Sequence, residues 1–271
     1  MRGSVYRRGS RWEYRFDLPP DALTGKRRNA TKMGFLTRKD AQLAMREAMA
    51  LAERGRHVQP SRRSVESFLD EWLTGVEGKI RRTTWSSYRD YRDAYVNPII
   101  GSTALQDLTP VRLNLLYAHL VKQGRVHKIA GGNDGLAPKT VRNVHVMLRR
   151  ALRDAVKWGY LPRNPAEDAE PPSSRGGKRK VWTPEQLRTF IQHAEGDRHY
   201  ALWLLVATTG LRRGELAGLR EQDVDLKRGT VSPATPRVVV DGFAETSQPK
   251  TDSGYRTLAL DPGRRHIGLL G

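Results

Sequence analysis

Cysteine is absent from the 271 residues. Disulfide bridges and thiolate metal sites are therefore excluded, and no group of His with Asp or Glu has metal-ligand spacing, so we expect neither a metal nor another cofactor. Long apolar runs are also missing. The longest, 201–207, is far too short to cross a bilayer, and the first residues lack the apolar core of a signal peptide. We therefore expect a cytoplasmic protein with no membrane partner.

Acidic residues are in the minority, with 29 Asp and Glu against 48 Lys and Arg and a formal net charge of +19. Such an excess favours a polyanionic partner, because neutralised phosphates release their counterions, and it predicts steeply salt-dependent binding. Charge alone leaves open double-stranded DNA, RNA and a merely soluble basic protein. The hydrophobic content of 38% is low but sufficient for two or three globular domains.

Residues 1–58 alternate in short segments of strand character and then continue into a helix, expected over Thr37–Arg54. Thr37 is the expected N-cap, with Asp40 at the capping-box position. The strand-like segments are 4–7, 11–18 and 30–35. The packed face of the helix is expected to comprise Leu43, Ala44, Ala48 and Leu51.

Basic side chains lie on or beside these three segments. A small basic sheet can bind in a DNA groove, although a solvated basic face is the alternative interpretation. The candidate DNA-binding residues of this region are Arg7, Arg8, Arg11, Arg15, Lys26, Arg27 and Arg28.

From 64 to 168 the pattern is helical. Thr109 is the expected N-cap of a helix whose first residue is Pro110, and Ala137-Pro138 opens another helix with a proline at its first position. In the second of these helices His145 falls on the apolar face, so we interpret it as a core histidine rather than a catalyst. The aromatic residues also interpreted as core are Trp85, Tyr88 and Tyr95. Another face of the second helix carries a stripe that suits phosphates and equally solvent, formed by Arg149, Arg153 and Lys157.

Residues 169–181 combine proline, serine, glycine and a basic run, which is typical of a flexible linker between domains. Arg179 and Lys180 within this segment are further candidates for phosphate contacts. Thr183-Pro-Glu-Gln186 follows directly and supplies an N-cap, a first-turn proline and a capping-box glutamine. A domain boundary is therefore expected here.

The stretch TTGLRRGELAGLREQDVD, residues 208–225, contains an arginine where a helix should start. The helix is predicted to begin near Leu211, so Arg212 shares a face with Leu216 and Leu219 and is expected to point inward. A cation at the positive end of a helix needs an anion beside it.

That anion has two possible sources. Glu215, three residues after Arg212, can form a local ion pair without functional meaning. An external phosphate, held by the guanidinium, is the functional alternative. The pattern alone does not decide between them.

This stretch resembles the first catalytic box of the tyrosine recombinases, the phage integrase family, which reads roughly TGLRxGELxxLxWxDVD. By this resemblance Arg212 is the first catalytic arginine. The usual aromatic residue of the second half is Glu221 here, at a packing position. The matching residues are Thr209, Gly210, Leu211, Arg212, Gly214, Glu215, Leu216, Leu219, Asp223, Val224 and Asp225.

A second box, over Gln248–Leu260, resembles the PKTxxSxRTxxL hairpin of the same family, which implies that Lys250 is the catalytic lysine. Val238–Val240 and Thr257–Leu260 have strand composition, and the connection between them is rich in turn residues. The resemblance implies that Arg212 holds two phosphate oxygens and that Lys250 lends a proton to the leaving 5′ oxygen. In the family a tyrosine attacks the DNA and forms a 3′-phosphotyrosyl link.

The resemblance covers nearly the whole chain and implies a multidomain α+β fold. Its parts are an arm-type DNA-binding domain with a small three-stranded sheet plus a helix (1–58), a helical core-binding bundle (64–168), a linker (169–181) and the N-terminal part of a mainly helical catalytic domain with a β-hairpin (182–271). The implied partner is double-stranded DNA at the attachment sites of a phage or other mobile element, bound by a homotetramer.

The family's second box, His-x-x-Arg, and its tyrosine nucleophile follow the hairpin, and neither occurs in these 271 residues. No histidine has an arginine three residues later, and the one tyrosine after Lys250 is Tyr255, inside the hairpin. We therefore expect a C-terminally truncated, incomplete catalytic domain that does not cleave DNA or assemble a tetramer alone. The alternative is a non-catalytic DNA-binding remnant that competes with a full-length integrase. An RNA-binding or ribosome-associated protein would explain the charge but not the two boxes.

Overall fold

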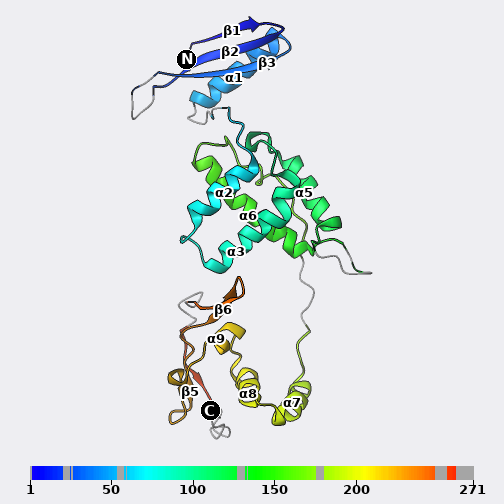
Figure 1. The fold of residues 1–271 in the computed structure, drawn as a ribbon, viewed down its shortest axis with the longest axis vertical. Helices are drawn as coiled ribbons and strands as arrows, with labels where there is room; N and C mark the ends of the chain where they lie inside the picture. The colour runs from blue at the N-terminus through cyan, green and yellow to red at the C-terminus, as the bar shows by residue number, and fades with distance from the viewer. Residues whose placement is uncertain are drawn as a thin grey trace. The chain divides into compact units, whose positions relative to one another are not determined.

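The computed structural model describes residues 2–20, 25, 27–53, 58, 60–126, 132, 134–174, 180–247 and 255–260. The chain divides into two compact units, one formed by 1–80 with 87–174 and the other by 81–86 with 175–271. Along the chain, Figure 1 shows a sheet with one helix in blue, a group of helices in cyan and green, and a mixture of short helices and strands in yellow and orange. The fold is therefore mixed α+β, as the sequence predicts.

The N-terminal sheet contains three antiparallel strands in the order β1-β2-β3, followed by one helix. Their bounds are β1 (Gly3–Arg8), β2 (Arg11–Leu18), β3 (Arg28–Phe35) and α1 (Arg38–Glu53). Oγ1 of Thr37 accepts a hydrogen bond from the Asp40 N–H (3.1 Å) and donates one to the Asp40 carboxylate (2.7 Å). The predicted N-cap of α1 is thus confirmed.

α1 packs on one face of this sheet through small side chains. Ala41 and Ala52 are buried, and Ala44, Met45 and Ala48 pack against the core formed with the sheet. The prediction that Leu43 lies on the packed face was wrong, because its side chain is 60% exposed. A stripe of alanines lets the helix approach the sheet closely, and Leu43 lies more than half a turn away from Ala41.

A bulge in β3 determines which face of the sheet Phe35 occupies. Phe35 pairs with Trp12 and Met33 pairs with Glu13, so that Gly34 is the extra residue, at φ +103°. Phe35 therefore lies on the α1 side with Tyr14, at a ring-centroid distance of 5.7 Å. The opposite side, which we name the open face, carries Ser4, Tyr6, Arg8, Arg11, Glu13, Arg15, Asp17, Asn29, Thr31 and Met33.

The middle of the chain is helical. Its elements are α2 (Val65–Val76), α3 (Arg82–Tyr91), the π-helix η1 (Arg92–Val96), α4 (Asn97–Ile100), the 3₁₀ turn η2 (Leu105–Asp107), α5 (Pro110–Gln123) and α6 (Pro138–Lys157). Pro110 and Pro138 open α5 and α6, and the Thr109 side chain caps α5, as predicted. The indole N–H of Trp72 donates to Asp154 (2.9 Å) and thereby joins α2 to α6. The large buried side chains include Phe68, Leu69, Trp72, Leu113, Leu116, Leu120, Met147, Leu148 and Leu152.

His145 is a core residue, as predicted. Its side chain is 8% exposed, and its Nδ1 lies 2.9 Å from the hydroxyl of Tyr117. The aromatic residues Trp85, Tyr88 and Tyr95 were predicted to be core, but each is only half-buried. Tyr88 stacks on Trp72 from the edge of the helical core, since α3 buries none of its residues fully.

The C-terminal region contains short elements. They are α7 (Pro184–His193), η3 (Ala194–Gly196), α8 (Tyr200–Thr209), α9 (Arg213–Ala217), η4 (Glu221–Asp223), β4 (Val224–Asp225), β5 (Thr230–Val231), β6 (Arg237–Val240), β7 (Phe243–Thr246) and β8 (Leu258–Ala259). Thr183 and Gln186 form the predicted capping box at the start of α7.

The two segments predicted as strands around Lys250 belong to different sheets. β6 pairs with β7, whereas β8 pairs with β5 in a sheet of order β4-β5-β8. Asp241 and Gly242 close the β6–β7 hairpin with φ of 53° and 82°. Asp-Gly is a strong signal for a two-residue hairpin turn, and it makes β6 return at once. No helix in the described part of the chain is long and apolar enough to cross a membrane.

The buried His145 predicts a pH-dependent stability of the helical domain. Burial, with Arg149 and Arg142 nearby, lowers the pKa of His145. The unfolded chain then binds this proton more readily than the folded chain does. The contribution of His145 to the free energy of unfolding is therefore complete above the ordinary pKa of about 6.5 and is lost as the pH falls below this value. The loss is at most about 1.4 kcal/mol for each pH unit. Urea unfolding between pH 8 and pH 5 should show this loss.

His145→Gln should flatten the pH dependence, because glutamine does not titrate. His119→Gln is the matched control, since His119 is exposed on α5. If His145→Gln keeps the wild-type pH dependence, the protonation of another group is responsible.

Candidate functional site

The segment between α8 and α9 sets the position of Arg212. Gly210 ends α8 in the left-handed region (φ 64°), and the buried Leu211 follows. Arg212 has extended backbone angles (φ −69°, ψ 149°) and precedes the first helical residue, Arg213. The helix therefore starts two residues later than predicted.

The prediction that Arg212 points inward was wrong, because its side chain is 74% exposed. Since Arg212 is not helical, a projection at 100° per residue does not apply to it. The inward position of α9 belongs instead to Glu215, which is 6% exposed. A carboxylate can be buried here because several donors surround it, whereas a buried guanidinium would need several acceptors.

Glu215 binds two arginines, one that is close in the sequence and one that is distant. Its carboxylate accepts hydrogen bonds from the backbone N–H of Arg212 (2.9 Å) and from Nη1 of the same residue (2.8 Å). Arg256 donates two further hydrogen bonds through Nη1 (3.1 Å) and Nη2 (3.0 Å), which is a bidentate pair. The local ion pair considered from the sequence is thus present, and it is one half of a larger cluster.

Arg256 was not among the residues selected from the sequence. It occupies the arginine position of the PKTxxSxRTxxL pattern, so the motif itself contained the signal. Its side chain is 28% exposed. The hydrogen bond to Glu215 is the main cause that raises the pKa of Arg256.

The cluster keeps its charges over a wide pH range. Burial raises the pKa of Glu215, but the hydrogen bonds from Arg256 and Arg212 outweigh this effect and bring the pKa to about 2. One carboxylate therefore faces two guanidinium groups. The excess positive charge lies on the exposed Arg212, whose planar group suits a phosphate.

Two glycines bring α9 directly against β6. A Cβ on Gly214 would lie 2.9 Å from the carbonyl oxygen of Arg237, and one on Gly218 would overlap the carbonyl oxygen of Thr235. Glycine is therefore required at both positions for packing, which also explains why a poor helix former occurs in this segment.

Three of the candidate residues, Lys26, Lys250 and Arg179, lie outside the described residues. Lys180 is exposed just before α7.

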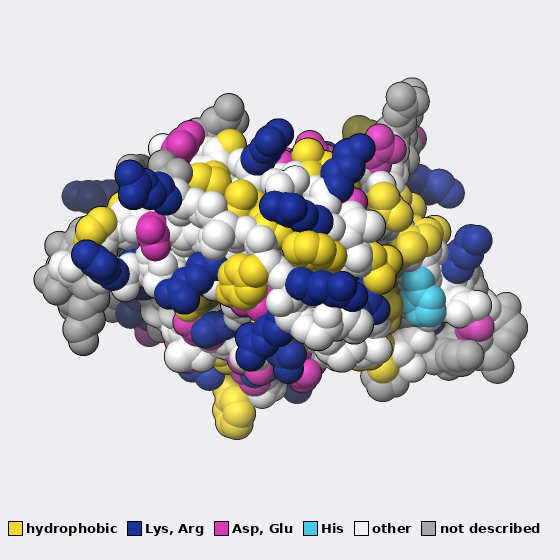
Figure 2. Space-filling view, turned by 90° about the horizontal axis from the view of Figure 1, so that it is seen from above, with side chains coloured by type: hydrophobic (Ala, Val, Ile, Leu, Met, Phe, Trp, Pro, Cys, Tyr) yellow, Lys and Arg dark blue, Asp and Glu magenta, His cyan; other side chains and the backbone are white. Residues whose placement is uncertain are grey.

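The basic candidates of the N-terminal domain are divided between the two faces of the sheet. Arg8, Arg11 and Arg15 lie on the open face. Arg7 pairs with Trp12 and Arg28 with Leu18, so both lie on the α1 side, at its ends. These residues and Arg27 are all exposed. Figure 2 shows Lys and Arg side chains spread over the face of the molecule that it presents, with hydrophobic side chains between them.

The predicted basic stripe of α6 is also on the surface. Arg149, Arg153 and Lys157 are exposed, while the opposite side of α6 is buried in the helical core. Lys157 lies 3.8 Å from Asp154, its one acidic neighbour within the described part of α6. These side chains are therefore accessible to phosphates.

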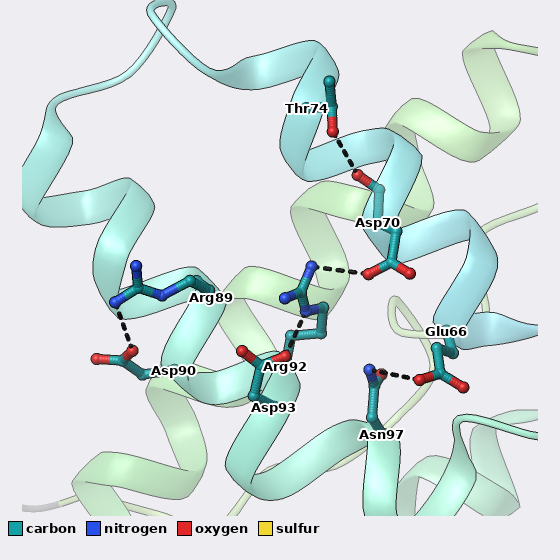
Figure 3. Close-up of polar contacts among 8 residues, drawn as sticks. All are labelled: Glu66, Asp70, Thr74, Arg89, Asp90, Arg92, Asp93 and Asn97. Carbon is teal, nitrogen blue, oxygen red and sulfur yellow. Dashed lines mark hydrogen bonds and ion pairs between the residues drawn. The ribbon is translucent and has the colours of Figure 1, made fainter.

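Other arginines of the helical domain are neutralised by neighbouring acids, as Figure 3 shows. Arg92 is 18% exposed and forms ion pairs with Asp70 (2.7 Å) and Asp93 (2.6 Å). The hydrogen bond to Asp93 is the main cause that raises the pKa of Arg92. Arg92 thus joins η1 to α2 and has a structural role, in contrast to the stripe on α6.

Comparison with known families agrees with this arrangement. The family model described as "Arm DNA-binding domain" matches residues 4–50, which contain the sheet and most of α1. The one described as "Phage integrase, N-terminal SAM-like domain" matches residues 64–120, from the start of α2 into α5. The chain belongs to the phage integrase family of tyrosine recombinases. Both matches precede the segment that contains Arg212.

Curated relatives of this integrase-family chain match larger shares of it. A tyrosine recombinase XerC-like protein of Caldanaerobacter subterraneus is 24% identical over 71% of this chain and 48% of its own length. An integrase of Streptomyces ambofaciens is 25% identical over 83% of this chain and 56% of its own length. The chain thus spans about half the length of these curated relatives.

The integrase fold itself is also found among solved structures. The Tn1549 transposon integrase, solved in complex with transposon right end DNA, is 20% identical with a TM-score of 0.59. The likeness covers 73% of this chain and 62% of that one. At this identity the likeness shows the shared fold.

Replacing Glu215 should destabilise the C-terminal unit. Glu215→Gln removes the anion between Arg212 and Arg256, and we expect the free energy of unfolding to fall by about 3 kcal/mol. This value is at the low end for a broken buried ion pair, because both arginines retain contact with water. Because the pKa of Glu215 is about 2, the wild-type contribution should persist above about pH 4.5 and disappear as the pH falls towards 2.

Chemical denaturation of the wild type, Glu215→Gln and a control variant at pH 7 measures this loss of stability. Glu221→Gln is the matched control, since Glu221 is exposed in the neighbouring η4 and should change the stability by less than about 0.5 kcal/mol. Equal stabilities of the two variants would contradict the assigned importance of the Glu215 cluster.

Proposed function

We propose that this chain supplies the DNA-recognition domains and the first part of the catalytic domain of a site-specific recombinase. The recombinase cuts and rejoins double-stranded DNA at the attachment sites of a phage or other mobile element, through a 3′-phosphotyrosyl intermediate. The observation that carries this proposal is the exposed guanidinium of Arg212, anchored by the buried Glu215.

The anchor leaves a defined edge of Arg212 for DNA. Within the described part of the chain, Glu215 engages the Nη1 of Arg212, and the group is still 74% exposed. The edge formed by Nε and Nη2 can then hold two non-bridging oxygens of one phosphate. Negative charge grows on those oxygens when a nucleophile attacks, so a preorganised guanidinium stabilises the transition state more than the ground state.

Lys250 has the complementary role in this proposal. Its ammonium group can give a proton to the leaving 5′ oxygen, which an arginine cannot do readily. The support is the motif around Lys250 and its position eight residues before Leu258, where β8 begins.

Double-stranded DNA is the proposed partner of all three domains. The support is the +19 net charge, the arginines of the open face and the accessible stripe on α6. We propose the domain boundaries 1–58, 64–168, 169–181 and 182–271. A tetramer on two duplexes is proposed for the whole recombinase.

Arg212→Ala should lower the affinity for the core duplex about tenfold, because one charge-assisted phosphate contact is lost. The duplex is one that the wild-type chain selects from a random library. Its phosphates are replaced one at a time by uncharged methylphosphonate, and each affinity is measured by fluorescence anisotropy. At the single phosphate that Arg212 contacts, the wild type and Arg212→Ala should bind equally.

Arg213→Ala is the matched control, because Arg213 is the exposed neighbour at the start of α9. Any loss of affinity in Arg213→Ala should persist on the duplex in which the phosphate contacted by Arg212 is uncharged. A loss in Arg212→Ala that is the same on every duplex would mean that Arg212 contributes only general charge, and the proposed catalytic role would fail.

A further inference from the structure

The open face of the N-terminal sheet contains a buried carboxylate. Glu13 is in the middle of β2 and is 3% exposed, although the alternation of β2 turns it away from α1. Its cross-strand neighbours, Tyr6 on β1 and Met33 on β3, flank it and are both exposed. Glu13 therefore lies beneath the side chains that form the surface of this face.

The two oxygens of Glu13 have different surroundings. Oε1 accepts a hydrogen bond from the hydroxyl of Tyr6 (3.0 Å). Oε2 is buried and receives no hydrogen bond from the described residues, and Nη1 of Arg8 lies 3.6 Å from it as an ion pair. The side chain of Arg8 is itself 71% exposed. One end of the Arg8 guanidinium is thus attracted to a fixed anion while the remainder faces solvent.

A carboxylate at this position has costs that need an explanation. An oxygen buried without a hydrogen bond is unfavourable, and a negative charge among Arg8, Arg11 and Arg15 opposes phosphate binding. A well-packed apolar side chain would fill the centre of the sheet without either cost. The benefit must therefore come from what the charge does to its neighbours.

The benefit is orientation of Arg8. A free arginine has many rotamers, and holding it in one of them before binding reduces the entropy lost on binding. Phosphate contacts carry no sequence information, whereas the bidentate contact of arginine with O6 and N7 of guanine reads the base and needs the guanidinium plane aligned with the base edge. The centre of a sheet that lies in the major groove faces base edges, and Arg8 adjoins the central row of Tyr6, Glu13 and Met33.

We propose that Glu13 is a positioning residue that aims Arg8 at a guanine edge in the major groove of the DNA site bound by this sheet. Tyr6, also on β1, fixes the other oxygen of the carboxylate through its hydrogen bond to Oε1. This inference rests on the proposed function, because it names which base one part of the DNA interface reads.

The test compares the full-length wild-type chain with Glu13→Gln, Arg8→Ala and Arg8→Lys in selections from a random double-stranded DNA library, followed by sequencing. The wild type should enrich a motif with one strongly preferred guanine. All three variants should lose the preference at that same position by about tenfold or more, with the rest of the motif retained. A merely structural role of Glu13 would weaken every position together.

Affinity for unselected DNA separates orientation from charge. Glu13→Gln should bind it as tightly as the wild type or more tightly, since one negative charge is removed, while Arg8→Ala should bind it more weakly. Arg8→Lys should bind unselected DNA as the wild type does, because the positive charge is kept although the planar guanidinium is lost. This variant leaves the buried carboxylate untouched, so it tests the inference even if Glu13→Gln unfolds the domain.

Glu47→Gln is the matched control, because it removes an exposed carboxylate from α1. It should select the wild-type motif. Retention of the guanine preference by Glu13→Gln would overturn the role of Glu13 alone, and its retention by Arg8→Ala would show that Arg8 does not read the base. A wild-type chain that enriches no motif would overturn the proposed function and this inference with it.

Discussion

The buried carboxylate of Glu215 is the contact on which the candidate site depends. It joins the start of α9 to Arg256, forty-one residues later, and its hydrogen bonds to both arginines lower its pKa to about 2. Because Glu215 takes the inward position, Arg212 can remain exposed while one end of it is fixed. Gly214 and Gly218 complete the arrangement by bringing α9 against the backbone of β6.

Carboxylates and arginines are combined in the same way in the N-terminal sheet. Glu13 is 3% exposed and forms an ion pair, at 3.6 Å, with Arg8, which is 71% exposed, whereas the buried Glu215 accepts hydrogen bonds from Arg212. In the helical domain the balance is reversed, since Arg92 is largely buried between the exposed Asp70 and Asp93. The buried partner is thus the acid in the pairs of Arg8 and Arg212, and the arginine in the pairs of Arg92.

Local signals predicted the ends of elements well, and tertiary packing explains the failures. The caps at Thr37, Thr109 and Thr183 depend on a few neighbouring residues and are found as predicted. The packed face of α1 and the direction of Arg212 depend on what each helix meets, so periodicity alone gave Leu43 and Arg212 the wrong environment. The pairing of β6 with β7 was predictable from Asp241-Gly242, whereas the pairing of β8 with β5 had no local signal.

The most direct test of the anchored Arg212 is a crystal structure of this chain bound to a core duplex that it selects. We expect Nε and Nη2 of Arg212 within hydrogen-bond distance of two oxygens of a single DNA phosphate, with Nη1 still bonded to Glu215 and Arg256 still paired with the same carboxylate. A guanidinium that faces solvent, or one that reaches DNA only after leaving Glu215, would contradict the proposed role of Arg212.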